Sequence, residues 1–225
     1  MEILNDIPVR LPLGEIRRQL HLDKDKRWEE VKTLLEVAKP LITPRAAYKI
    51  SYIDQKLENA VVIEGVRFTS RVLRKNLDEV ERVFPYVITI GNQLKETAGE
   101  SRDLIREYYF DIIGNIALSA TRKFLEKQLQ SRYGIDGMSF MSPGSLTDWP
   151  IEEQKPLFSL FGEGETPIGV KLNKSLLMLP AKSISGIYFP TEVSFFSCQL
   201  CRRDKCPGRK AAYDNKRAKE YGVLK

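Results

Sequence analysis

The longest regular pattern in the sequence is a stripe of apolar side chains that recurs at helical spacing from Ser101 to about Tyr133. Apolar residues three and four positions apart lie on one face of an α-helix, so the stripe predicts a single amphipathic helix that Ser101 caps. At 1.5 Å per residue such a helix is about 45 Å long, which is enough to cross a whole domain. The rest of the chain must therefore supply a long apolar surface for it.

The segments around this helix indicate strands as well as shorter helices. Residues 60–63 and 66–68 flank a turn and predict a hairpin, and the β-branched run 85–90 predicts a buried strand. Two more strands are expected on either side of Pro180-Ala-Lys182. Further helices are expected at 27–38, at 70–82 and from Pro44 to Tyr52. Helices interspersed with paired strands predict an α+β fold with a mainly antiparallel sheet.

The chain of 225 residues is long enough to bury a real core. We expect one domain, with an N-terminal helical portion at 1–60, the sheet and the long helix at 61–200, and a basic C-terminal tail at 201–225. No apolar run approaches the roughly 18 residues of a membrane span, and the N-terminus lacks a signal-peptide pattern. A cytoplasmic protein without a membrane partner is therefore expected.

The net charge of +6 is concentrated in the tail, where nine basic side chains face three acidic ones. An electrostatic partner should therefore meet the C-terminal end of the chain, and the alternative is a solvated terminal helix. A nucleic-acid partner is the weakest interpretation. The only aromatic residues of the tail are Tyr213 and Tyr221, and no standard zinc-finger spacing is present.

Three cysteines, Cys198, Cys201 and Cys206, form a C-x2-C-x4-C array. An odd number of closely spaced cysteines fits no disulfide framework and agrees with a reducing compartment. Thiolates at this spacing are ligands for a soft metal, so the array predicts a zinc ion or an iron–sulfur cluster with three protein ligands. The alternative is three reduced thiols without a ligand.

A second group of signals lies between residues 142 and 190. Ser142-Pro-Gly-Ser145 predicts a tight turn, with Asp148 as a helix cap, Pro150 at the first helical position and Trp149 as a core anchor. The segment Gly169-Val-Lys-Leu172 follows, and after it come Met178, Pro180, Ser183, Ser185 and Gly186. This order of pieces resembles the activation domain of cobalamin-dependent methionine synthase. The resemblance is specific over 140–190 and extends more weakly over 85–133.

The resemblance implies a twisted antiparallel sheet and a function in reactivation. Domains of this family bind S-adenosylmethionine and support the reductive methylation of oxidised cobalamin. In this chain the domain would act as a separate module, with cobalamin presented by a partner, either a cobalamin-dependent methionine synthase or a related corrinoid protein. Transfer of a methyl group needs positioning rather than a protein acid or base, and His21 is the only histidine, so we assign no catalytic residue.

The resemblance also implies which residues contact S-adenosylmethionine. Aligned on Gly144, the binding loop of the family corresponds to Ser142, Pro143, Gly144 and Ser145, and an aromatic side chain on a later segment corresponds to Phe196 or its neighbour Phe195. Phe140 stands where the family has an arginine. An alternative function is a corrinoid-protein activator in which the cysteines hold a metal or cluster and binding of S-adenosylmethionine is lost.

Overall fold

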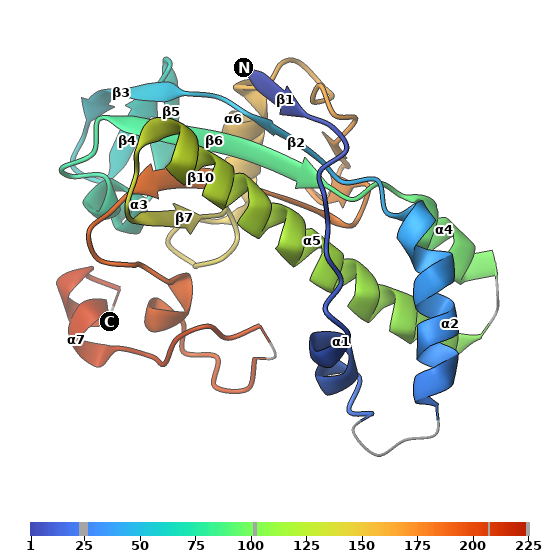
Figure 1. The fold of residues 1–225 in the computed structure, drawn as a ribbon. Coiled ribbons are helices and arrows are strands. Elements are labelled where there is room, and N and C mark those ends of the chain that lie inside the picture. Colours follow the sequence, from blue (N-terminus) through green and yellow to red (C-terminus); the bar gives the residue numbers. More distant parts are fainter. Residues whose placement is uncertain (23–26, 101–102, 207, 224–225) are drawn as a thin grey trace.

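A computed structural model describes residues 1–22, 27–100, 103–206 and 208–223 (Figure 1). The structure is an α+β fold with a curled antiparallel sheet and flanking helices, as the sequence predicts. The α-helices are α1 (Leu13–Gln19), α2 (Trp28–Ala38), α3 (Arg71–Asn76), α4 (Gln93–Glu100), α5 (Leu104–Tyr133), α6 (Gln154–Ser159) and α7 (Asn215–Glu220). Short 3-10 turns occupy η1 (Lys39–Leu41), η2 (Ile151–Glu153) and η3 (Ser197–Leu200).

The main sheet has eight strands, and every pairing among its described residues is antiparallel. Its central strand is β6, which pairs with β2 and β3 on one side and with β10 on the other. Strand β7 pairs with the far side of β10, and a two-stranded ribbon of β8 and β9 stands apart. The strands are β1 (Glu2–Leu4), β2 (Arg45–Tyr48), β3 (Ser51–Lys56), β4 (Ala60–Ile63), β5 (Val66–Thr69), β6 (Arg82–Thr89), β7 (Met138–Met141), β8 (Lys171–Leu172), β9 (Met178–Leu179) and β10 (Ser183–Pro190).

Alternation along β6 divides the core between the two faces of the sheet. Val83 and Val87 pack into a cluster that includes Trp149 and the side chains of α6, whereas Phe84 and Tyr86 pack against α5. Successive side chains of a strand point to opposite faces, so a strand buried on both faces reads as a continuous apolar run. The predicted strand at 85–90 is thus confirmed.

The predicted long helix is confirmed as the 30 residues of α5, which crosses one face of the sheet (Figure 1). Its cap is Asp103, whose carboxylate accepts a hydrogen bond from Ile105 N at 2.9 Å, and Ser101 lies outside the described residues. The N-terminal half of α5 forms a helical cluster with α1, α2 and α4. No helix in the described ranges is long and apolar enough to cross a membrane.

The predicted helix from Pro44 to Tyr52 is wrong, because this segment forms β2 and the beginning of β3. The N-terminal portion 1–60 consequently contains strands in addition to α1 and α2. In β3 the buried residues Ser51 and Ile53 alternate with the exposed Tyr52 and Asp54. Pairing with the central strand β6 decides the structure here, and that pairing connects residues far apart in the sequence.

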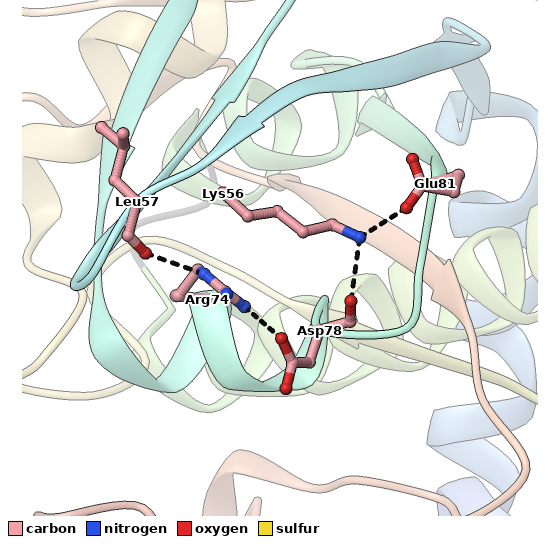
Figure 2. Close-up of polar contacts among 5 residues, drawn as sticks. All are labelled: Lys56, Leu57, Arg74, Asp78 and Glu81. Carbon is pink, nitrogen blue, oxygen red and sulfur yellow. Dashed lines mark hydrogen bonds and ion pairs between the residues drawn. The ribbon is translucent and has the colours of Figure 1, made fainter.

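The predicted hairpin is confirmed as β4 and β5, which pair from Ala60↔Thr69 to Ile63↔Val66. Helix α3 follows it and is tied to neighbouring segments by the polar contacts that Figure 2 shows. Arg74 donates to the carbonyl of Leu57 at 2.8 Å and to the Asp78 carboxylate at 2.7 Å. Lys56 donates to the carbonyl of Asp78 at 2.8 Å and to the Glu81 carboxylate at 2.5 Å. These contacts join the ends of β3 and α3 to the start of β6.

Asp148 caps a different helix from the one that the sequence suggests. Its carboxylate accepts hydrogen bonds from the Ser70 hydroxyl at 2.5 Å and from Val72 N at 2.9 Å, both at the start of α3. Pro150 precedes the turn η2 and does not begin a regular helix, since α6 starts at Gln154. Asp148 therefore connects the loop after β7 to the hairpin region.

Replacing Asp148 by alanine should lower the free energy of unfolding by about 2 kcal/mol, because the first turn of α3 loses an acceptor that is mostly shielded from water. Urea unfolding followed by circular dichroism measures this difference. Glu152→Ala, which removes an exposed carboxylate nearby, is the matched control and should change stability by less than about 0.5 kcal/mol. Equal stability of the two variants would contradict the assigned role of Asp148.

Candidate functional site

The site region is built on β10, whose small residues let other segments approach closely. The hydroxyl of Ser183 donates to the Thr89 hydroxyl at 2.9 Å on the central strand β6. Gly186 is fully enclosed, and a Cβ atom there would lie 2.4 Å from the carbonyl oxygen of Met141 and 2.8 Å from the Ser142 hydroxyl. No side chain fits in this space, so glycine is required for β7 and the start of the loop to lie against β10.

The loop Ser142–Ser145 forms the predicted tight turn. Ser145 N donates to the carbonyl of Ser142 at 3.1 Å, and Gly144 N donates to the carbonyl of Trp149 at 2.7 Å. Gly144 has a φ of +81°, and a Cβ atom there would lie 3.0 Å from the Ile151 side chain. Trp149 is fully buried and confirms the expected core anchor at the base of the loop. The turn is therefore rigidly supported and requires glycine at position 144.

The outer part of this loop lines one cleft, which we name the Gly144 cleft. Gly144 and Ser145 are exposed here, and Arg71, Cys201 and Arg202 form other parts of the wall of a space of about 660 Å³. The inner residues point away from it, since Pro143 is buried and Ser142 is half-buried beside Gly186. The four predicted contact residues of the loop thus divide into two that line a cleft and two that hold the turn in place.

A second cleft of about 540 Å³ lies between α5, β7 and the C-terminal segment, and we name it the Phe140 cleft. Phe140 and Phe196 contribute aromatic side chains to it, and Arg122 and Lys210 contribute cations. Arg122 is nearly buried and donates to the Glu126 carboxylate at 2.8 Å. Burial raises the pKa of the neighbouring Tyr188 hydroxyl well above its ordinary value. That hydroxyl stays protonated and donates to the carbonyl of Arg122 at 3.1 Å.

The structure brings the loop and the predicted aromatic segment side by side. The hydroxyls of Ser145 and Ser197 share a hydrogen bond at 3.4 Å, directly after Phe196. Both Phe195 and Phe196 line the Phe140 cleft. Phe195 is buried and stacks on Tyr221 with ring centroids 5.6 Å apart, whereas Phe196 is half-buried. Phe196 is therefore the member of the pair that is open to a ligand.

The three cysteines lie on and after η3 with free, half-buried thiols. Among the residues that the structure describes, no three His, Cys, Asp or Glu side chains are placed to hold one metal ion. The predicted zinc or iron–sulfur site at Cys198, Cys201 and Cys206 therefore has no support from the geometry. The guanidinium of Arg209 holds this segment together, since it donates hydrogen bonds to the carbonyls of Cys198 at 3.2 Å, Cys201 at 3.0 Å and Arg203 at 2.5 Å.

Sequence reasoning missed two residues of the Phe140 cleft, Arg122 and Lys210. Arg122 lies between Leu118 and Leu125, among the apolar positions of α5 that face the sheet. A basic residue at a position of this kind is unusual, and it could have marked Arg122 as a candidate site residue. Lys210 carried no signal of its own, because its place beside Phe140 depends on how the C-terminal segment folds back.

Residues 143–212 match the family described as vitamin B12 dependent methionine synthase, activation domain. A crystal structure of the MetH reactivation domain bound to AdoHcy has a similar fold, with a TM-score of 0.54 and 12% sequence identity over 88% of this chain and 81% of that chain. No curated protein matches the chain in sequence. The family match and the shared fold together confirm the predicted resemblance to the activation domain of vitamin B12 dependent methionine synthase.

Proposed function

We propose that the chain reactivates a cobalamin-dependent methionine synthase, with S-adenosylmethionine as the methyl donor for the reductive methylation of oxidised cobalamin on the partner. The observation that carries the proposal is the family match over 143–212, which includes the Gly144 turn and the segment of Phe196. The similar fold of a reactivation domain bound to AdoHcy supports it, because AdoHcy is S-adenosylmethionine without the transferable methyl group.

In this proposal the chain acts by binding and orienting its ligand. S-adenosylmethionine supplies an activated methyl group, and its transfer to reduced cobalamin requires no acid or base from this chain. Gly144 and Ser145 would contact the ligand from the loop, because both are exposed at the wall of the Gly144 cleft. Gly144 adopts the positive φ of the turn and leaves room for the Ile151 side chain. Ser142 and Pro143 would keep the turn in place. A rigid loop lowers the entropic cost of holding the methyl group toward cobalt.

The alternative of a corrinoid-protein activator with a cysteine-bound cluster depends on a metal centre. The arrangement of the described cysteines gives that centre no support. The donor contacts of Arg209 account for the conformation of the segment without a metal. We therefore retain the first proposal alone.

Replacing Gly144 by valine should weaken the binding of AdoHcy and S-adenosylmethionine at least about tenfold, because a β-branched residue disfavours positive φ and would meet Ile151. Isothermal titration calorimetry measures both affinities. The control is Gly99→Val in α4, where an added side chain meets open space and binding should be unchanged. Undiminished binding by Gly144→Val, in protein with an unaltered melting temperature, would exclude the loop from the ligand site.

The basic tail suggests how the partner is engaged. Some of its cations are used internally, since Arg209 holds the cysteine segment and Arg217 donates to the Gln199 side chain at 2.5 Å. Arg203, Lys205 and Lys216 are exposed and form no ion pair with the described residues. These three cations are therefore free to attract an acidic surface on the corrinoid-carrying partner.

Changing Arg203, Lys205 and Lys216 together to glutamate should slow association with a cobalamin-loaded methionine synthase about tenfold at low salt, with a smaller effect at high salt. Stopped-flow measurements over a salt series test this. A matched variant with Lys95, Lys155 and Lys174 changed to glutamate has the same net charge but alters exposed residues outside the tail. If both variants associate equally fast, the tail is a solvated surface and does not direct docking.

A further inference from the structure

Cys198 and Cys201 lie at the two ends of one backbone turn. Cys198 belongs to η3, and Cys201 N donates to the carbonyl of Cys198 at 3.3 Å. A turn with a hydrogen bond between residues three apart keeps its end Cα atoms within about 7 Å, and side chains at these positions of a 3-10 turn lie on the same side. The Cα atoms of disulfide-bonded cysteines are usually about 4.4–6.8 Å apart. The backbone of η3 therefore has the spacing that a disulfide requires.

Hydrogen bonds from the following segment hold this turn in place. The guanidinium of Arg209 donates to the carbonyls of both cysteines, and Lys210 N donates to Cys198 Sγ at 3.4 Å. Asp214 N donates to the carbonyl of Gln199, between the two cysteines, at 2.8 Å. Closing a bond between two residues that are already fixed costs little conformational entropy. The two thiols are therefore arranged to react with each other.

One of the two thiols is accessible to a small molecule. Cys201 lines the Gly144 cleft, whose volume of about 660 Å³ is within the range of small-molecule pockets. Arg71 and Arg202 add two cations to the same wall, against the carboxylate of Asp148. This charge, together with the basic tail, attracts anionic molecules.

The third cysteine is held by a contact outside η3. Cys206 is five residues beyond Cys201, and its carbonyl accepts a hydrogen bond from Arg209 N at 3.1 Å. No i→i+3 hydrogen bond joins it to either of the other cysteines in the part of the chain that the structure describes. The geometry thus distinguishes one pair from the third thiol.

We propose that Cys198 and Cys201 form a reversible disulfide by exchange with a small anionic disulfide of the glutathione type. The Cys201 thiolate attacks one sulfur of the oxidant, whose S–S bond breaks and releases a thiolate. The Cys198 thiolate then attacks the Cys201 sulfur of this mixed disulfide and releases the second thiolate. Two electrons pass from the pair to the oxidant, and the two protons of the cysteines end on the two released thiols.

This modification site goes beyond the proposed function, because it needs neither S-adenosylmethionine nor a corrinoid partner. It would make the wall of the Gly144 cleft respond to the balance of thiols and disulfides around the protein. The site is therefore tested on the chain alone.

The full chain is reduced, freed of reductant without oxygen and equilibrated with oxidised glutathione. Free thiols are then blocked at low pH, and the protein is digested with trypsin. Trypsin releases Cys198 and Cys201 together in peptide 183–202 and Cys206 in peptide 206–209. We expect mass spectrometry to find peptide 183–202 lighter by two hydrogens, in at least about tenfold excess over any bridge to Cys206. An excess of reduced glutathione should restore both thiols.

Two variants separate the steps of the exchange. Cys206→Ser is the matched control and should form the bridge as the unaltered chain does. Cys198→Ser should stop at the mixed disulfide and keep glutathione on Cys201. The inference is overturned if the bridge includes Cys206 or joins two chains, or if the unaltered chain forms only mixed disulfides or fails to react. It is also overturned if Cys201 of the Cys198→Ser variant takes up no glutathione, or if reduced glutathione does not reopen the bridge.

Discussion

The close contact at Gly186 lets β7 and the loop after it lie directly against β10. Its backbone lies so near Met141 and Ser142 that any Cβ atom would overlap the carbonyl oxygen of Met141. Strand β10 pairs with the central strand β6 on one side and with β7 on the other, from Ile187↔Met141 to Pro190↔Met138. The absence of a side chain at Gly186 permits the end of β7 to lie at this distance. Phe140 on β7 and the Gly144 turn after it are positioned as a consequence. A glycine within a strand commonly marks such an approach of two backbones.

The C-terminal segment completes both clefts and is packed on the domain. Tyr221 stacks on Phe195 and donates to the Asn76 side chain at 3.0 Å, and Ala218 is fully buried. Arg209 donates to the carbonyls of Cys198, Cys201 and Arg203 in a segment with little regular structure. This packing places Lys210 in the Phe140 cleft and Cys201 in the Gly144 cleft. The tail therefore contributes to the site as well as to the net charge.

Strong local periodicity explains which elements could be predicted. The stripe of α5, the hairpin of β4 and β5 and the apolar run of β6 each carry their signal within one segment. The segment after Pro44 is too short for a helical pattern to be reliable, and its pairing with β6 decides its conformation. Asp148 was assigned to the following helix because local spacing cannot reveal a cap on a helix more than 70 residues earlier.

The candidate site shows the same division between local and long-range information. The positive φ of Gly144 follows from the turn sequence around it, and the turn was predicted. The resemblance implied that an arginine of the family stands at the position of Phe140, and it gave no sign that the fold brings Arg122 and Lys210 to the ring of Phe140 from two other elements. Cysteine spacing suggested a metal, whereas the conformation of the segment depends on the distant donor Arg209. The spacing of residues along the sequence cannot predict which charged side chains come together only in the folded chain.

The most direct test of the account is methyl transfer to cobalamin in a reconstituted system. A methionine synthase that lacks its own activation domain is loaded with cob(II)alamin and supplied with an electron donor and methyl-labelled S-adenosylmethionine, without oxygen. The account predicts that labelled methylcobalamin and AdoHcy form in equal amounts when this chain is added, and that neither forms above background without it. Equal formation in its absence, or none in its presence, would contradict the account.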